Sequence, residues 1–192
     1  MDVVHGKGGS RLRLLAPMRY LAIRHPEKTR YDFVYPAAIG IIVWGAYVLI
    51  YPKPPLFGEL GLLRFARDLL IMAVPFMVGA LAAVSMGAPG THMDRRPVGV
   101  ELYLDNDALT LRQFLCYLLG YLSFLGLLTL SAVVTAGLLR EPILSWTAHA
   151  PISRVAVHLV GSAILSLMLS FLSVTVFWSL YFLTDIANQK NA

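Results

Sequence analysis

Residues 155–184 read VAVHLVGSAILSLMLSFLSVTVFWSLYFLT and contain no Asp, Glu, Lys or Arg. A transmembrane helix needs only about 20 consecutive, mainly apolar residues to cross the hydrocarbon core of a bilayer. A block without these charges and of this length therefore predicts a membrane-spanning helix that tilts or extends by a turn into water. Trp178 and Tyr181 lie near its far end, where aromatic side chains favour the interface between membrane and water.

Three similar apolar blocks precede this one, at about residues 33–51, 69–86 and 111–139. Thr110 and Gln113 form a T-x-x-Q capping box at the start of the third block. The whole chain is 57% apolar and 14% charged, whereas a soluble domain has about 25% charged residues. We predict an all-α integral membrane protein, in which residues 32–184 form a bundle of four transmembrane helices.

The segment before the first block, residues 1–31, is basic and amphipathic. Residues 11–30 read RLRLLAPMRYLAIRHPEKTR, in which cationic and apolar side chains are interleaved. This pattern is typical of a helix that lies on an anionic lipid surface, and Pro17 and Pro26 would mark its first residue and its end. The residues that we expect to contact the membrane surface are Arg11, Arg13, Arg19 and Arg24.

The loop between the second and third blocks, residues 87–110, contains the segment VGVELYL at residues 98–104. Apolar side chains alternate there and are followed by Asp105, Asn106 and Asp107, so the segment predicts a strand and a turn, as in a small β-hairpin. His92, Arg95 and Arg96 in the same loop could bind an anionic ligand through their side chains and nearby backbone N–H groups. The alternative is that the arginines only mark the cytoplasmic side of the membrane.

The distribution of basic residues predicts the orientation. Of the sixteen Lys and Arg residues, eleven lie before the first block, near the middle loop or in the tail at residues 185–192, and five lie on the other side. Loops rich in Lys and Arg stay in the cytoplasm. We therefore expect both termini and the middle loop to be cytoplasmic, in a bacterial inner membrane. We expect the basic side chains to interact with the headgroups of the lipid bilayer, and we expect no nucleic-acid partner.

Ser162, Ser166, Ser170 and Ser173 follow one another at steps of four, four and three, so they share one face of the last helix. Small residues allow helix backbones to approach, which favours helix packing. The alternative is a hydroxyl-lined pore face in an oligomer. The second helix carries a comparable row of small residues, Pro75, Gly79 and Ala83, which favours packing within the chain or dimerisation.

The sequence contains few residues or motifs that would indicate catalysis or cofactor binding. The predicted spans carry no ionisable residue near their centres, the single cysteine excludes an intrachain disulfide, and we expect no cofactor or metal. Ser153, Arg154 and His158 resemble the S-R-x-x-x-x-x-H element of the type-2 phosphatidic acid phosphatase family. The spacing here is two residues shorter, and the upstream lysine and arginine motif is missing. The resemblance implies a lipid-modifying membrane enzyme, which we keep as the weakest alternative.

These observations favour a non-enzymatic, homo-oligomeric membrane protein. Its assembled helices would form or disrupt a permeability pathway that is gated from the cytoplasmic side by an anionic signal or a partner protein. Small bacterial membrane effectors of stress or antiphage signalling have this general organisation, an analogy of architecture alone. The second hypothesis is an accessory or anchoring subunit that docks a partner protein.

Overall fold

Four long apolar helices dominate the computed structural model of the chain, which describes residues 13–23, 28–87, 94, 103–104, 107–147 and 151–186. The four helical segments that could cross a membrane are Arg30–Leu49, Leu62–Ser85, Leu111–Leu138 and Ile152–Thr184. The prediction of an all-helical chain with four helices long and apolar enough to cross a membrane is thereby confirmed.

The first span combines a π-helical turn, η2 (Arg30–Val34), with α1 (Tyr35–Leu49). The second is α2 (Leu62–Ser85), and the third is α3 (Leu111–Leu138). The fourth is α5 (Pro151–Tyr181), which continues into the π-helical turn η4 (Phe182–Ile186). A short helix that the sequence analysis did not predict, α4 (Arg140–Thr147), links α3 to α5.

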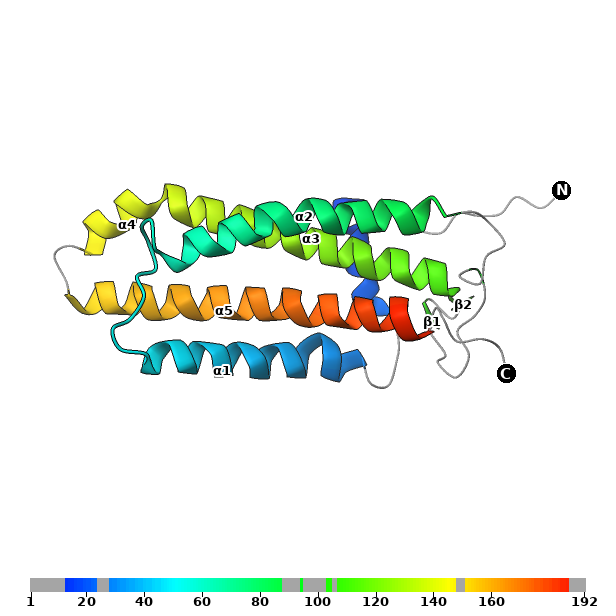
Figure 1. Cartoon of the computed structure of the whole chain (residues 1–192), viewed down its shortest axis with the longest axis horizontal. Coiled ribbons are helices and arrows are strands. Elements are labelled where there is room, and N and C mark those ends of the chain that lie inside the picture. The colour runs from blue at the N-terminus through cyan, green and yellow to red at the C-terminus, as the bar shows by residue number, and fades with distance from the viewer. Residues whose placement is uncertain are drawn as a thin grey trace.

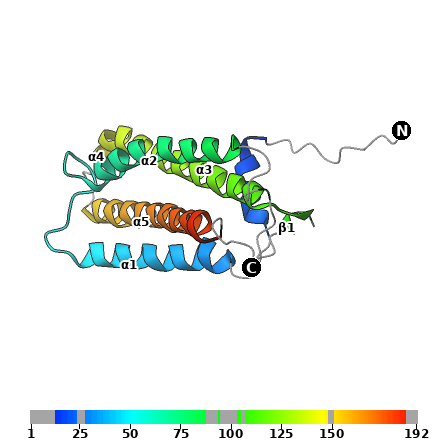
Figure 2. The same cartoon turned by 45° about the vertical axis from the view of Figure 1, so that its right-hand side comes forward.

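The four spans form a row in the order α2, α3, α5 and α1 (Figures 1 and 2). Helix α2 packs along α3 and α1 packs along α5, while α3 and α5 join the two pairs. The main contacts of each edge helix are thus with one neighbour, so the arrangement is more open than a closed four-helix bundle. Below, the end of the row that carries α4 is called the α4 end, and the opposite end is called the η1 end.

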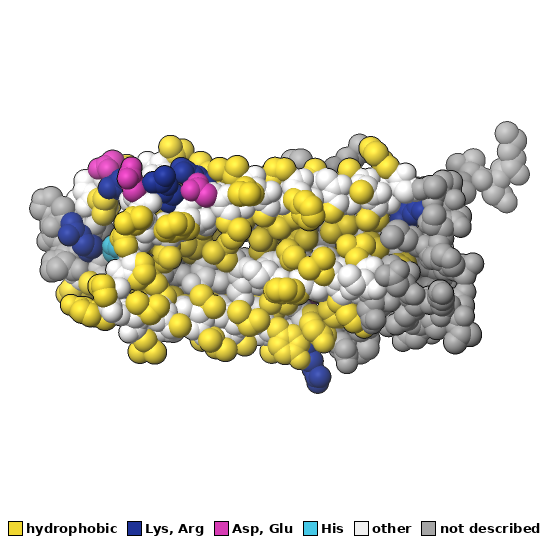
Figure 3. All heavy atoms as spheres, viewed as in Figure 1, with side chains coloured by type: hydrophobic (Ala, Val, Ile, Leu, Met, Phe, Trp, Pro, Cys, Tyr) yellow, Lys and Arg dark blue, Asp and Glu magenta, His cyan; other side chains and the backbone are white. Residues whose placement is uncertain are grey.

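Helix α3 contributes more buried side chains to the core than any other span. Its buried side chains include Phe114, Leu118 and Leu122, and it is the most buried of the four candidate spans. A Cβ atom at Gly126 would lie 3.1 Å from Cγ2 of Val74, so the glycine allows α2 to approach α3 closely. The remaining lateral surface is covered mainly by apolar side chains, as expected for a surface that faces lipid (Figure 3).

Several helix boundaries differ by a few residues from the predicted ones, and the start of α2 differs most. Helix α2 begins at Leu62, seven residues before the predicted start, because Arg64, Arg67 and Asp68 are accommodated in its first two turns. These exposed side chains form ion pairs and can extend toward water. Helix α1 ends at Leu49, where Ile50 adopts an extended conformation.

The predicted capping box of α3 is confirmed. The backbone N–H of Gln113 donates to the Thr110 hydroxyl at 3.3 Å, and the backbone N–H of Thr110 donates to Oε1 of Gln113 at 3.0 Å. These bonds satisfy N–H groups that a helix start otherwise leaves without partners.

The described segments outside the spans include two short strands and a 3-10 helix. Strands β1 (Tyr103–Leu104) and β2 (Asp107–Ala108) pair antiparallel over only two residue pairs, and residues 98–102 lie outside the described part. The N-terminal segment forms a 3-10 helix, η1 (Arg13–Ala22), which includes Pro17 rather than beginning at it. This helix contacts α3, and its residue Tyr20 is completely buried.

Candidate functional site

A buried ionic group lies at the η1 end. The carboxylate of Asp32 forms an ion pair with Nζ of Lys28 at 3.4 Å and accepts a hydrogen bond from the Tyr20 hydroxyl at 2.9 Å. The Lys28 ammonium also donates to the backbone carbonyl of Tyr20, and it lies 4.1 Å from the centre of the Tyr20 ring. Only 7% of each charged side chain is exposed. We call this group the Tyr20–Lys28–Asp32 cluster.

Local sequence explains how the cluster forms. Lys28 and Asp32 are four residues apart on the helical turn that leads into α1, so their side chains lie on the same face. The third member, Tyr20, comes from η1. An unpaired charge in such a buried position is strongly unfavourable, whereas here each charged group has an oppositely charged partner and further contacts. The cluster therefore binds the N-terminal segment to the start of the first span.

Aromatic rings surround the cluster and connect it to α3 and α5. Tyr20 stacks on Tyr121 with 5.1 Å between the ring centres, and it lies 6.1 Å from Phe114. Phe114 in turn packs 4.5 Å from Phe182 at the end of the last span. The packing of η1 therefore involves two spans, the third and the fourth, through a continuous set of rings.

A second aromatic contact closes the same end between α1 and α5. Tyr31 stacks on Trp178 with 4.2 Å between the ring centres. The indole N–H of Trp178 is buried and has no aligned hydrogen-bond acceptor in the described part of the chain. Tyr31 and Trp178 also line an apolar cavity of about 500 Å³ between the two helices.

Burial changes the proton affinities of the two members of the cluster that lie outside the spans. Burial, and to a smaller extent the negative charge of Asp32, raises the pKa of the Tyr20 phenol. Burial also lowers the pKa of the Lys28 ammonium, although the Asp32 carboxylate opposes this effect. Tyr20 therefore remains a protonated hydrogen-bond donor near neutral pH. All three groups bind one another, an arrangement that suits a structural contact better than proton transfer to a substrate.

The serine residues of α5 occupy different environments. Ser162 and Ser170 are buried, with 1% and 5% of their surface exposed. Ser170 donates across the helix contact to the Pro36 carbonyl at 2.7 Å, whereas Ser162 donates within its own helix. Ser166 is half-buried, and Ser173 is exposed and donates to the carbonyl of Leu169. The structure therefore places only part of the serine row at the contact between α5 and α1.

The predicted anion-binding residues His92, Arg95 and Arg96 lie outside the described part of the chain, as do Arg11 and Arg24. The backbone of Arg13 belongs to η1, but its side chain is not among the described ones, and Arg19 is exposed.

Near this loop, the structure shows a contact that the sequence analysis did not predict. Arg112 at the start of α3 donates to the Gly87 carbonyl at 2.7 Å and pairs with Asp94 at 3.0 Å. Gly87 and Asp94 are thereby bound to the start of α3.

The residues that resemble a phosphatase element lie at the α4 end. Arg154 is exposed, and the ring of His158 packs edge-on against Phe57 at 6.3 Å between ring centres. Within the described residues, no three or more His, Cys, Asp or Glu side chains gather as a metal site would require.

Sequence reasoning missed the Tyr20–Lys28–Asp32 cluster because it treated the segment before the first span as a surface-bound helix. The available signal was a pair of opposite charges spaced by four residues directly before an apolar block. With the geometry in place, comparison of the chain with protein-family models, curated proteins and solved structures gives no match.

Proposed function

We propose that this chain is a non-enzymatic membrane protein that assembles into homo-oligomers, and that the assembled spans form or disrupt a permeability pathway across the membrane. The observation that carries the proposal is the open row of helices. In this row, the outer face of α2 carries the exposed small residues Pro75, Gly79 and Ala83. A Cβ atom added at Gly79 would meet no other atom within 4 Å. Small residues let helix backbones approach closely, which suits contact with a second copy.

The Tyr20–Lys28–Asp32 cluster supports a gating role for the N-terminal segment. Ionisable groups buried at a span are unfavourable unless paired, and they are often functional. Here, hydrogen bonds from the Tyr20 hydroxyl to Asp32 and from Lys28 to the Tyr20 carbonyl hold η1 against the start of the first span, and η1 also packs against α3. Release of η1 would expose the Lys28–Asp32 pair and the aromatic side chains around Tyr20, so gating would consist of a change from this docked state to a released one. In the proposed orientation this end is cytoplasmic. An anionic molecule or a partner protein that binds the basic loop there would shift the equilibrium between docked and released η1.

The alternative of an accessory subunit uses the same exposed face of α2, with a different polypeptide in place of a second copy. The two proposals differ in one measurable property. A pore-forming protein purifies as a homo-oligomer and makes liposomes permeable by itself, whereas an anchoring subunit stays monomeric and needs its partner.

The experiment uses the full chain, purified in a mild detergent. Its mass is measured by size-exclusion chromatography with light scattering, and its activity is measured after reconstitution into liposomes that hold a potassium diffusion potential. We expect a defined oligomer and loss of the potential. A monomer that leaves the potential intact contradicts the proposal.

The matched pair of variants is Gly79→Leu on α2 and Gly45→Leu on α1. Neither glycine has another atom within 4 Å of its added Cβ, so both variants should keep the fold of the single chain. We expect only Gly79→Leu to reduce the oligomer and the permeability. Equal behaviour of both variants would exclude the α2 face as the contact between copies.

A further inference from the structure

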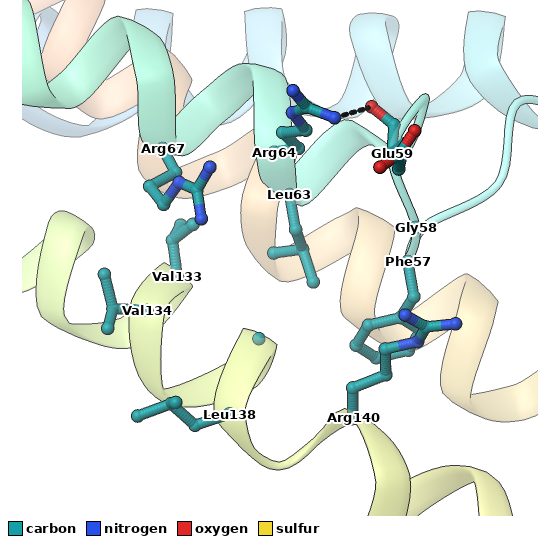
Figure 4. A pocket seen from close by; sticks show the side chains of 11 residues that line it. Phe57, Gly58, Glu59, Leu63, Arg64, Arg67, Val133, Val134, Leu138 and Arg140 are labelled. Carbon is teal, nitrogen blue, oxygen red and sulfur yellow. Dashed lines mark hydrogen bonds between the residues drawn. The ribbon is translucent and has the colours of Figure 1, made fainter.

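A cavity of about 500 Å³ opens at the α4 end, away from the Tyr20–Lys28–Asp32 cluster (Figure 4). Its cationic side chains are Arg64 and Arg67 from α2 and Arg140 from α4. Its apolar wall includes Val134 and Leu138 near the end of α3. The volume lies within the range of about 300–1,000 Å³ that is typical of small-molecule sites.

Local geometry explains why the arginines surround one space. Arg64 and Arg67 are three residues apart, so they lie on the same side of α2. Gly58, with a positive φ of 109°, turns the loop before α2 so that the Glu59 carbonyl accepts a hydrogen bond from Arg64 at 3.2 Å. Arg140 comes from the chain directly beyond the end of α3 and approaches from the opposite side (Figure 4).

The three guanidinium groups keep donors available for a ligand. Arg64 and Arg67 share the carboxylate of Asp68, at 3.9 and 3.1 Å. The nearest carboxylate oxygen to Arg140 is that of Glu141, at 3.8 Å. Each guanidinium has five N–H donors, and between 46% and 47% of each arginine side chain is exposed. The cavity lining therefore contains three arginines against one acidic side chain, that of Glu59. The half-exposed guanidinium groups keep N–H donors that their ion pairs with Asp68 and Glu141 do not use.

The position of the cavity restricts the class of ligand. Its arginines lie in the first two turns of one span and just after the end of another, which is the depth of the lipid headgroups. Its apolar wall continues along α3 toward the centre of the membrane. A phosphate group matches the planar fork of a guanidinium, and an acyl chain matches Val134 and Leu138. A free phosphate ion would use only the arginines.

We propose that this cavity is a binding site for an anionic phospholipid, in which the arginines hold the headgroup phosphate and the end of α3 contacts the adjoining acyl chain. The site is independent of the proposed permeability pathway and of the orientation of the chain.

The first test uses the unmodified full chain in neutral detergent. Native mass spectrometry of the protein with equimolar phosphatidylglycerol and phosphatidylcholine measures which lipid is retained, and we expect about a tenfold preference for phosphatidylglycerol. In a parallel thermal-unfolding measurement, phosphatidylglycerol should raise the midpoint more than its deacylated headgroup or inorganic phosphate. Equal retention of the two lipids overturns the proposal. Equal stabilisation by inorganic phosphate would assign the site to a free anion instead.

The second test compares Arg140→Gln with Arg154→Gln. Both remove one exposed arginine from the same end of the molecule, but Arg154 does not line the cavity. We expect Arg140→Gln to lower the apparent affinity for phosphatidylglycerol about tenfold and Arg154→Gln to lower it less than about twofold. Equal losses would show that binding depends on overall charge and not on a site. If Arg140→Gln fails to fold, Arg67→Gln replaces it, with the same expected loss.

Discussion

Replacing Asp32 by leucine removes the carboxylate that Lys28 and Tyr20 share. Removing one partner of a buried ion pair costs about 3–5 kcal/mol, because the remaining charge is left without compensation. Lys28 retains its contacts with the Tyr20 carbonyl and ring, so we take the lower end of this range, about 3 kcal/mol. The loss should act on the docking of η1 and not on the four spans, since the cluster lies at one end of the row.

Ile23 provides a local reporter of this docking. It directly follows η1, its N–H donates to the Tyr20 carbonyl at 3.1 Å, and only 3% of its surface is exposed. In an Ile23→Cys, Cys116→Ala background, a maleimide labels the new cysteine only when η1 opens. When opening and closing are fast, the labelling rate follows the open population. A change of about 3 kcal/mol then increases the rate roughly 150-fold.

The double variant Lys28→Met, Asp32→Leu tests the cause. It removes both charges, and apolar replacement of a buried pair is often close to neutral. The Tyr20 hydroxyl still lacks its acceptor, which costs about 1 kcal/mol, so labelling should return to within about tenfold of the parent rate. Adding Tyr20→Phe should remove most of this remainder. The reasoning is refuted if Asp32→Leu labels at the parent rate, or if the double variant labels as fast as the single one.

Three further predictions concern the stability of the detergent-solubilised chain, which is measured by thermal unfolding for the first two and by hydrogen exchange for the third. Gly40→Leu should lower the free energy of unfolding by about 1–3 kcal/mol. The reason is that a Cβ at Gly40 would lie only 2.8 Å from Cδ2 and 3.2 Å from Cα of Leu167. An unchanged unfolding midpoint would contradict the packing of α1 on α5. Ser170→Ala should lower the free energy of unfolding by about 0.5–1 kcal/mol, because it removes the hydrogen bond to the Pro36 carbonyl between α5 and α1. Ser173→Ala should have a smaller effect, because Ser173 donates within its own helix. The opposite order would contradict the assignment of the interhelical contact to Ser170. Thr110→Ala should cost about 1 kcal/mol through loss of the capping box, measured as earlier fraying at the start of α3 by hydrogen exchange.

The spans could be read from the sequence because apolar length alone decides whether a helix can cross a bilayer. The start of α2 could not, since a charge count treats Arg64, Arg67 and Asp68 as residues of a loop. In the structure they belong to the first two helical turns and pair with one another. A long, flexible charged side chain can leave the apolar region while its backbone stays helical, so the backbone boundary and the charge boundary differ by about two turns.

The candidate site was harder to predict because its three members come from two segments that have no shared periodicity. The spacing of Lys28 and Asp32 places them on one face, but nothing in the sequence indicates that this face turns inward. Tyr20 lies eight residues before Lys28, and its burial depends on the packing of η1 against α3. The cluster therefore depends on a tertiary contact. The local sequence pattern predicts that Lys28 and Asp32 share a face, but it does not predict their contact with Tyr20.

Rows of small residues on α5 and α2 look equivalent in the sequence, yet the structure assigns them different surroundings. On α5, Ser170 bonds to the carbonyl of Pro36, so this part of the row is already used by packing within the chain. On α2, Gly79 has open space beside it. A helix period reveals which residues share a face but not which neighbour covers that face. Substitutions at the buried serines of α5 should therefore disturb the fold of the single chain, whereas substitutions at Gly79 can test the proposed assembly while the single chain stays intact.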